Sequence, residues 1–295
     1  MSMKKLSFAV FLLSSVAATA QAGESSFGWI YTADIQPKGK FELEQKAWLQ
    51  HRQAQGQYDN VLLQTELEYG VTDNYQAALY LNNRIVNAKN NNFDGTTGGP
   101  GTDIPAGNDP YASRHRSHLE SVSVENIYRV MNPLTDPIGL ALYVEPEIGP
   151  DVLELETRVI VQKNYLDDRL IVAGNLMAKS EREEGADNEI ERASALDTSV
   201  GFSYRFVDNW SAGLEYRNHQ EFLGYHFSDR EHSAHFIGPN VHYAAKNWWV
   251  TAAWHHQLPM VQTFSDDQKD VVQGNRIYGD EHARDEFMLK VGVPF

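Results

Sequence analysis

Short segments of alternating apolar and polar residues recur along most of this chain. The last of them closes the chain with one continuously apolar face, formed by Phe287, Leu289, Val291, Val293 and Phe295. A period of two residues indicates a β-strand with one apolar face. About twelve segments of this kind follow one another from residue 41 onward. Pro239 interrupts one of them, and because proline cannot donate to a strand ladder we expect a bulge at Gly238-Pro239.

The connections between these predicted strands fall into two length classes. Short turns such as Val71–Asn74 contain Asp or Asn, which tolerate turn backbone angles. Long loops are expected at Val86–Ser117 and Leu258–Glu281, with a charged loop at Glu181–Glu191. Loops this long are rare in compact domains but normal on the outer side of a membrane barrel. The pattern therefore predicts an all-β fold, a single transmembrane antiparallel up-and-down β-barrel of about 12 strands.

The amino end has a different organisation. Lys4 and Lys5, an apolar run over Leu6–Ala18 and the small residues of Ala20-Gln21-Ala22 are typical of a secretory signal peptide over residues 1–22. Residues 23–40 are too irregular for a strand, and we expect a periplasmic lead or a plug there. The predicted barrel then occupies residues 41–295.

Composition narrows the classes of function. The formal net charge is −15, and removal of residues 1–22 takes away two lysines and no acid. This acidic balance, without basic clusters, argues against a nucleic-acid partner. The chain has no cysteine, which excludes disulfides and thiolate metal sites. A mean hydropathy of −0.48 is compatible with a barrel, which needs apolar residues only at alternate strand positions.

The inward phase of the predicted strands carries charges of both signs. The lumen-lining candidates are Glu66, Glu68, Arg84, Glu125, Arg129, Glu154, Glu156, Arg158, Arg205, Glu215, Arg217 and Lys290. One interpretation is a lattice of paired charges and water that fills a narrow barrel, and the other is a selective path for a solute. Barrels of about eight strands are filled by side chains and those of sixteen or more leave a channel, so twelve strands leave both interpretations open.

Three stretches resemble known membrane proteins. The alternating carboxyl-terminal strand that ends on Phe295 resembles the last strand of Gram-negative outer-membrane β-barrels, where this pattern is an assembly signal. Residues 29–34 and 37–45 are similar to the opening of an uncharacterised family of proteobacterial outer-membrane barrels, and residues 69–75 to periplasmic hairpins of such proteins. The resemblance implies a location in the outer membrane, with membrane lipid and the barrel-assembly machinery as partners. It implies no cofactor, no metal and no identified substrate.

An outer-membrane enzyme is the alternative class. Twelve-stranded phospholipases of this membrane use Ser, His and Asn on the outer wall, with the spacing His-x-Ser. This spacing occurs at His115-Arg116-Ser117, without an obvious Asn partner in phase, and at His226-Phe227-Ser228, where Asn240 follows on the next strand. No ligand spacing supports a metal site at the loop histidines His118, His232 and His282.

The sequence therefore favours a narrow pore or a structural barrel. A lipid hydrolase and a cell-surface receptor remain the alternatives, because nucleophile, base and orienting group do not clearly share one face.

The resemblance at the carboxyl end yields a first prediction. Deletion of Phe295 should lower the amount of protein inserted into the outer membrane, because it removes the last residue of the assembly signal. Quantitative immunoblots of membrane fractions measure this, with wild-type amounts in total extract as the reference. Unchanged insertion would leave only an amphipathic strand.

Overall fold

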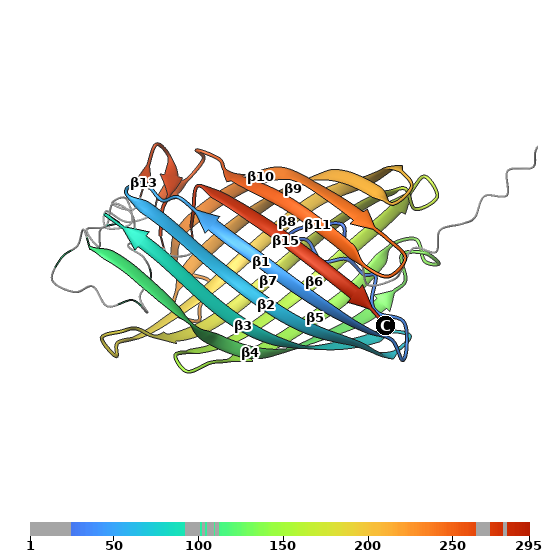
Figure 1. Cartoon of the computed structure of the whole chain (residues 1–295), viewed down its shortest axis with the longest axis horizontal. Helices are drawn as coiled ribbons and strands as arrows, with labels where there is room; N and C mark the ends of the chain where they lie inside the picture. Colours follow the sequence, from blue (N-terminus) through green and yellow to red (C-terminus); the bar gives the residue numbers. More distant parts are fainter. Residues whose placement is uncertain are drawn as a thin grey trace, which may run out of the picture.

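Twelve long antiparallel strands form a closed barrel in the computed structural model (Figure 1). The structure describes residues 25–91, 101, 104, 109, 112–263, 272–279 and 282–295, so the signal peptide expected at residues 1–22 lies outside the described part. The barrel strands are β1 (Phe41–His51), β2 (Gln57–Thr72), β3 (Tyr75–Lys89), β4 (Ser113–Met131), β5 (Gly139–Ile148), β6 (Val152–Tyr165), β7 (Leu170–Glu184), β8 (Ile190–Val207), β9 (Trp210–Leu223), β10 (Arg230–Ala244), β11 (Trp249–Gln257) and β15 (Asp285–Pro294). The predicted fold is confirmed.

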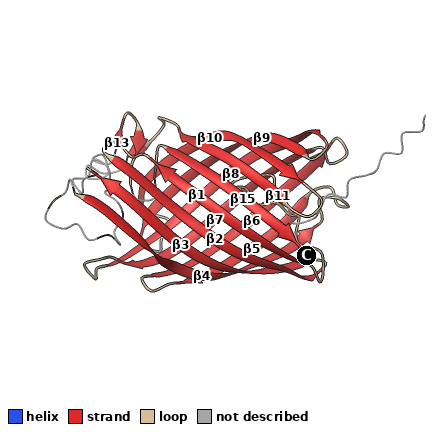
Figure 2. Ribbon diagram, viewed as in Figure 1, coloured by secondary structure: helices blue, strands red, loops and turns tan. Residues whose placement is uncertain are grey.

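The described residues form strands and loops only (Figure 2). No helix in this part of the chain is long and apolar enough to cross a membrane.

The last strand closes the barrel. β15 pairs along one edge with β1 and along the other with β11. The N–H of Phe295 donates to the carbonyl of Phe41 over 2.8 Å, and the N–H of Phe41 donates back over 3.1 Å. The two phenyl rings stack with their centroids 5.7 Å apart. The pairing of the first and last strands therefore continues up to the last residue of the chain.

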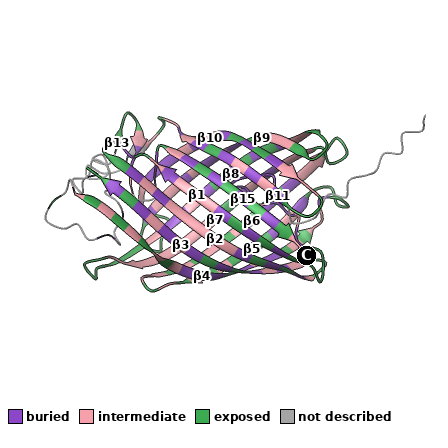
Figure 3. Ribbon diagram, viewed as in Figure 1, coloured by how far each residue is buried: buried purple, intermediate pink, exposed green. Residues whose placement is uncertain are grey.

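Buried and exposed residues alternate along the strands (Figure 3). The exposed face is apolar: Leu79 and Leu176, for example, are 56% and 54% exposed. All five apolar residues of the closing strand lie on this outer face, namely Phe287, Leu289, Val291, Val293 and Phe295. Such a surface is suited to lipid, because it would be unfavourable in water.

The two ends of the barrel differ. The carboxyl terminus lies at the end with the short turns, such as residues 73–74 between β2 and β3 and residues 208–209 between β8 and β9. The long connections lie at the opposite end, where Figure 1 shows β13. The connection between β11 and β15 contains three short strands, β12 (Gln262–Thr263), β13 (Val272–Gln273) and β14 (Arg276–Ile277).

The strands reach further into the predicted loops than the alternation indicated. β3 and β4 extend into the loop expected at Val86–Ser117, and β7 and β8 extend into the one expected at Glu181–Glu191. In these extensions most outward positions are polar, as at Asn87 and His115. The strands continue beyond the apolar band, so the apolar face that marks a strand in the sequence is lost before the strand ends.

The bulge expected at Gly238-Pro239 is wrong. Both residues keep their register with β9, and the register shift of β10 lies between Arg230 and His232. The pairing of β10 with β11 omits these two positions but keeps its register on either side. A Cβ at Gly238 would lie 1.6 Å from the carbonyl oxygen of Trp254. β10 and β11 therefore approach each other closely at Gly238. The missing ladder positions between them accommodate Pro239, which has no N–H to donate, so that no inserted residue is needed.

Candidate functional site

The candidate site is the lumen, where the inward side chains carry both charges. Lys46 Nζ lies 2.7 Å from Glu66 Oε2 and 3.9 Å from Glu44 Oε1. Across the lumen surface, Arg217 Nη2 lies 2.8 Å from both carboxylate oxygens of Glu286. All these side chains are buried, and a buried charge is costly unless it has a partner. The lumen wall is therefore a network of paired charges.

Most of the predicted lumen residues face this interior. They are Glu66, Glu68, Arg84, Glu125, Glu154, Glu156, Arg158, Glu215, Arg217 and Lys290, all buried or half-buried. Arg129 and Arg205 share this inward phase but lie beside the short turns. Arg129 Nη2 donates to the carbonyl of Asp73 in the β2–β3 turn over 2.6 Å, and the backbone N–H of Arg205 donates to the carbonyl of Arg169. The side chain of Arg129 and the backbone of Arg205 therefore link neighbouring strands at the short-turn end of the barrel.

Residues 25–36, here called the inner segment, run through the lumen near the short-turn end. The N–H groups of Gly28 and Trp29 donate to the two carboxylate oxygens of Glu215 on β9, over 2.6 and 2.9 Å. Asn240 Nδ2 on β10 donates to the same carboxylate over 2.9 Å. Glu215 therefore anchors one end of the inner segment.

Neutral amide side chains hold the rest of the inner segment. Asn175 on β7 accepts the N–H of Tyr31 over 2.7 Å and donates to its carbonyl over 2.9 Å. Gln162 on β6 accepts the N–H of Ala33 over 2.7 Å. The wall thus supplies side-chain partners in place of the second strand that an extended backbone would normally pair with.

Two further partners fix the segment's end at the short turns. Gln76 on β3 accepts the N–H of Gln36 over 2.7 Å, and the Gln36 side chain donates to Glu68 Oε2 over 3.0 Å. Sequence reasoning missed the neutral partners of the segment because it selected charged residues only. Asn and Gln residues at inward strand positions were the feature of the sequence that could have indicated these partners.

The ring of Tyr31 lies across the axis of the lumen. Arg158 on β6 lies 4.5 Å from the centroid of this ring, Lys46 on β1 lies 5.6 Å away and Lys290 on β15 lies 5.9 Å away. β6 and β15 are on opposite sides of the closed barrel. One ring that contacts cations from both walls must therefore occupy the middle of the lumen.

A tight turn leads from the inner segment into β1. Gly39 has a positive φ of 78°, and its N–H donates to the carbonyl of Gly70 over 2.7 Å. A Cβ at Gly70 would lie 2.2 Å from the carbonyl oxygen of Pro37. Gly39 suits this turn because L side chains rarely adopt its positive φ, and Gly70 suits it because a Cβ there would push the turn away from the barrel wall.

Loop residues also enter the lumen from the opposite end. Ile277, on β14, packs against Ala234 and Phe236 of β10, and Gln257 exchanges two hydrogen bonds with its backbone, over 2.8 and 2.9 Å. Ile104 packs against inward residues of β2 and β3. The described residues of the β11–β15 and β3–β4 connections therefore occupy part of the lumen at its mouth, which is the opening of the barrel at the long-loop end.

The structure separates the second His-x-Ser pair from its expected partner. His226 and Ser228 are exposed in the turn between β9 and β10. Asn240 is buried, faces inward and donates to Glu215. These three residues of the alternative, hydrolase interpretation do not form one group, because β10 keeps its phase through Gly238-Pro239.

The first His-x-Ser pair does have an asparagine partner. His115 and Ser117 lie two positions apart on the outward face of β4, and Asn87 is the register partner of His115 on β3. Asn87 Oδ1 lies 2.7 Å from His115 Nδ1. The next outward residues toward the short-turn end include Leu119 and Ile85, so this group borders the apolar band.

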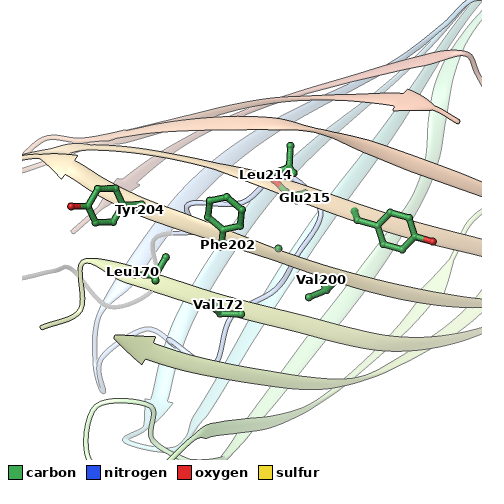
Figure 4. Close-up of a pocket in the computed structure, with 9 residues that line it drawn as sticks. Leu170, Val172, Val200, Phe202, Tyr204, Leu214 and Glu215 are labelled. Atoms are coloured by element: carbon green, nitrogen blue, oxygen red, sulfur yellow. The ribbon is translucent and has the colours of Figure 1, made fainter. Parts of the chain in front are cut away.

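A groove of about 630 Å³ lies on the outer wall over β7, β8 and β9, and Glu215 of the lumen also borders it (Figure 4). Its lining from β7, β8 and β9 is mainly apolar and includes Leu170, Val172, Val200, Phe202 and Leu214. These residues belong to the outward phase of their strands. The chemistry of the groove suits a hydrocarbon chain and not a polar solute.

Comparison with known proteins identifies a family for this chain but indicates no activity. The chain matches, over residues 19–295, a family described as "Family of unknown function (DUF6662)". No curated protein matches it.

Several solved structures are similar to this chain. The COG4313 outer membrane channel from Pseudomonas putida F1 superposes with a TM-score of 0.60 at 10% identity, covering 88% of this chain and 97% of that chain. A NanC porin gives a TM-score of 0.49 at 9% identity, covering 86% and 98%. The translocator domain of the autotransporter NalP from Neisseria meningitidis gives 0.49 at 11%, covering 89% and 90%. At such identities the likeness concerns the fold alone.

The contacts of Glu215 yield a prediction. Replacing Glu215 with Ala removes the acceptor of two buried N–H groups, and each unsatisfied donor costs about 1–3 kcal/mol. Amide hydrogen exchange at Gly28 and Trp29 should become about tenfold faster or more. The control is Glu154→Ala, which removes a lumen acid paired with Lys179 and no contact of the inner segment. Unchanged protection in Glu215→Ala would show that this carboxylate does not hold the segment.

Proposed function

The chain belongs to the DUF6662 family, whose function is unknown, and we propose that it is a narrow, cation-preferring channel of the Gram-negative outer membrane. In this proposal the inner segment closes the channel at rest and must shift for ions to pass. Membrane lipid surrounds the barrel, and the barrel-assembly machinery inserts it.

The observation that carries this proposal is the position of Tyr31. Its ring lies between cations on opposite walls of a lumen whose lining combines charged and polar groups with buried apolar side chains such as Ile127 and Ile160. A barrel with a purely structural role needs no polar interior of this kind. The ring therefore marks the narrowest part of a polar path.

The way in which the inner segment is held supports a movable closure. Its backbone bonds go to side chains such as Glu215, Asn175 and Gln162, and not to a strand of the barrel. Release of the segment would break these contacts and its apolar packing but would leave the barrel's own ladder intact. The wall can therefore stay closed toward lipid while the lumen opens.

The charges of the lumen set the expected selectivity. The inward acids include Glu42, Glu44, Glu66, Glu68, Glu120, Glu125, Glu145, Glu147, Glu154, Glu156, Glu181, Asp197, Glu215, Glu221 and Glu286. The inward bases include Lys46, Arg84, Arg114, Arg116, Arg158, Lys179, Arg217 and Lys290. Acids are in excess, and a pore lined by excess carboxylates favours cations. The name of the Pseudomonas putida protein as an outer membrane channel adds support at the level of the fold.

Single-channel recording in planar bilayers tests the proposal. Tyr31→Ala should give conductance steps several-fold larger than those of the wild type, because it removes the ring from the axis. Tyr31→Phe keeps the ring and should conduct like the wild type. In a KCl gradient the reversal potential should have the sign of cation preference. Absence of conductance in wild type and Tyr31→Ala alike, with both proteins folded, would leave a structural barrel.

A lipid hydrolase is the second candidate, supported by the hydrogen bond between Asn87 and His115. Asn87 Oδ1 accepts from Nδ1 of His115, which leaves Nε2 as the basic nitrogen. His115 Nε2 would take the hydroxyl proton of Ser117 as Ser117 Oγ attacks an ester carbonyl, and would pass it to the leaving alkoxide. Water would then release the fatty acid from Ser117.

Hydrolysis of phospholipid by the purified protein in mixed micelles tests this candidate. Ser117→Ala should lower the rate at least about a thousandfold, because a serine nucleophile has no substitute. Ser113→Ala is the matched control, since Ser113 is another exposed serine on the outer face of β4. A rate that is equal in Ser117→Ala and Ser113→Ala would exclude Ser117 as the nucleophile.

A further inference from the structure

Four ionisable residues from three segments meet inside the long-loop end of the barrel. His219 and Glu221 lie two positions apart on the inward face of β9, and His232 faces inward from β10. His282 comes from the segment before β15, where it forms a bridge with Gly279. Neither of the functions proposed above uses this group.

The distances within the group are close to those of a metal site. One ligand atom each from His219, Glu221 and His282 can be chosen so that all three lie within 4.8 Å of one another. Ligands around a tetrahedral zinc ion at about 2.1 Å are themselves about 3.4 Å apart. Small side-chain rotations therefore bring the three residues into coordination range.

The ligands are oriented by neighbouring groups. Asp197 Oδ1 lies 2.5 Å from His219 Nδ1, so that Nε2 is the nitrogen this ring presents to a metal. His232 Nε2 lies 3.1 Å from Glu221 Oε2 and holds that carboxylate in place. A carboxylate behind a histidine ligand is the usual second contact of zinc sites, where it fixes the tautomer and the ring direction.

His282 supplies an independent sign of a missing ligand. Its side chain is 1% exposed, and among the described residues its Nε2 atom has no hydrogen-bond partner. The ring faces the other two imidazoles, with centroids 5.0 Å from His219 and 4.5 Å from His232. A buried ring nitrogen without a partner is costly, and a bound cation would remove that cost.

The local charge also matches a divalent cation. Asp197, Glu221 and Glu286 place three carboxylates around the group. Arg217 is the nearby cation, 2.8 Å from Glu286 and 3.8 Å from Asp197. Glu231 also lies beside Glu221 and His232. With neutral imidazoles the carboxylates outnumber the one arginine, so the local charge is negative and favours a divalent cation.

We propose that His219, Glu221 and His282 bind a divalent transition-metal ion of the zinc class at the long-loop end of the barrel. Imidazole and carboxylate donors suit zinc better than calcium or magnesium, which prefer oxygen alone. Asp197 and His232 act as positioning residues. The ion would join β9 to the segment that leads into β15, and so fix the long connection over the mouth.

Isothermal titration of the folded, chelator-treated full-length protein with zinc chloride tests the site. The wild type should bind one equivalent, and His282→Ala should lose this binding. Asp197→Asn keeps all three ligands and should weaken it about 10- to 100-fold. The control is His51→Ala, whose ring contacts Asp59 on the barrel wall outside the group and whose loss should leave binding unchanged.

A second measurement separates a specific site from loose surface binding. Zinc should slow hydrogen exchange in residues 272–279 of the wild type and should have no effect there in His282→Ala. Heat-modifiable gel migration confirms that each variant is folded, and Glu221→Gln replaces His282→Ala if the latter does not fold. Equal zinc affinity in the wild type and in the folded ligand variant would overturn the proposal, whatever the conductance of the barrel.

Discussion

Pairing of β15 with β1 is the constraint on which the rest of the structure depends. In hydrocarbon an unpaired backbone N–H or C=O costs several kcal/mol, so a sheet with an open edge is not stable there. Once β15 pairs with β1 on one side and β11 on the other, every strand has one face toward lipid and one toward the lumen. The exposed Leu79 and the buried Glu125 are two results of the same closure.

The width of the closed ring then explains why a length of chain lies inside it. Twelve strands enclose more space than inward side chains fill in barrels of about eight strands. The inner segment occupies part of this space, but its backbone groups must be paired as well. Glu215, Asn175, Gln162 and Gln76 meet that need from four strands. Some of the polar side chains in the lumen thus form hydrogen bonds with the backbone of the inner segment. The remaining charged side chains pair with each other.

The barrel could be predicted from the sequence because lipid imposes the same alternation on every strand. That rule also placed most of the inward charges, among them Glu215 and Arg217. It could not show that a neutral Asn175 would hold Tyr31, nor that Asn87 is the register partner of His115, because strand register follows from pairing and not from alternation. Sequence spacing gave no support for a metal site at His232 and His282 for a similar reason, since the residues that meet around His219 come from distant segments.

The same argument accounts for where candidate chemistry is found. Within the apolar band the outward positions must be apolar, and the inward positions carry paired charges or amide and apolar side chains that contact the inner segment. Beyond the band at the long-loop end, the strands continue without that restriction, and polar residues can occupy both faces. Asn87 and His115 lie on the outer face there, while His219 and Glu221 lie on the inner face. Extension of the strands beyond the lipid therefore gives a rigid frame on which groups that bind or react can be held in fixed register.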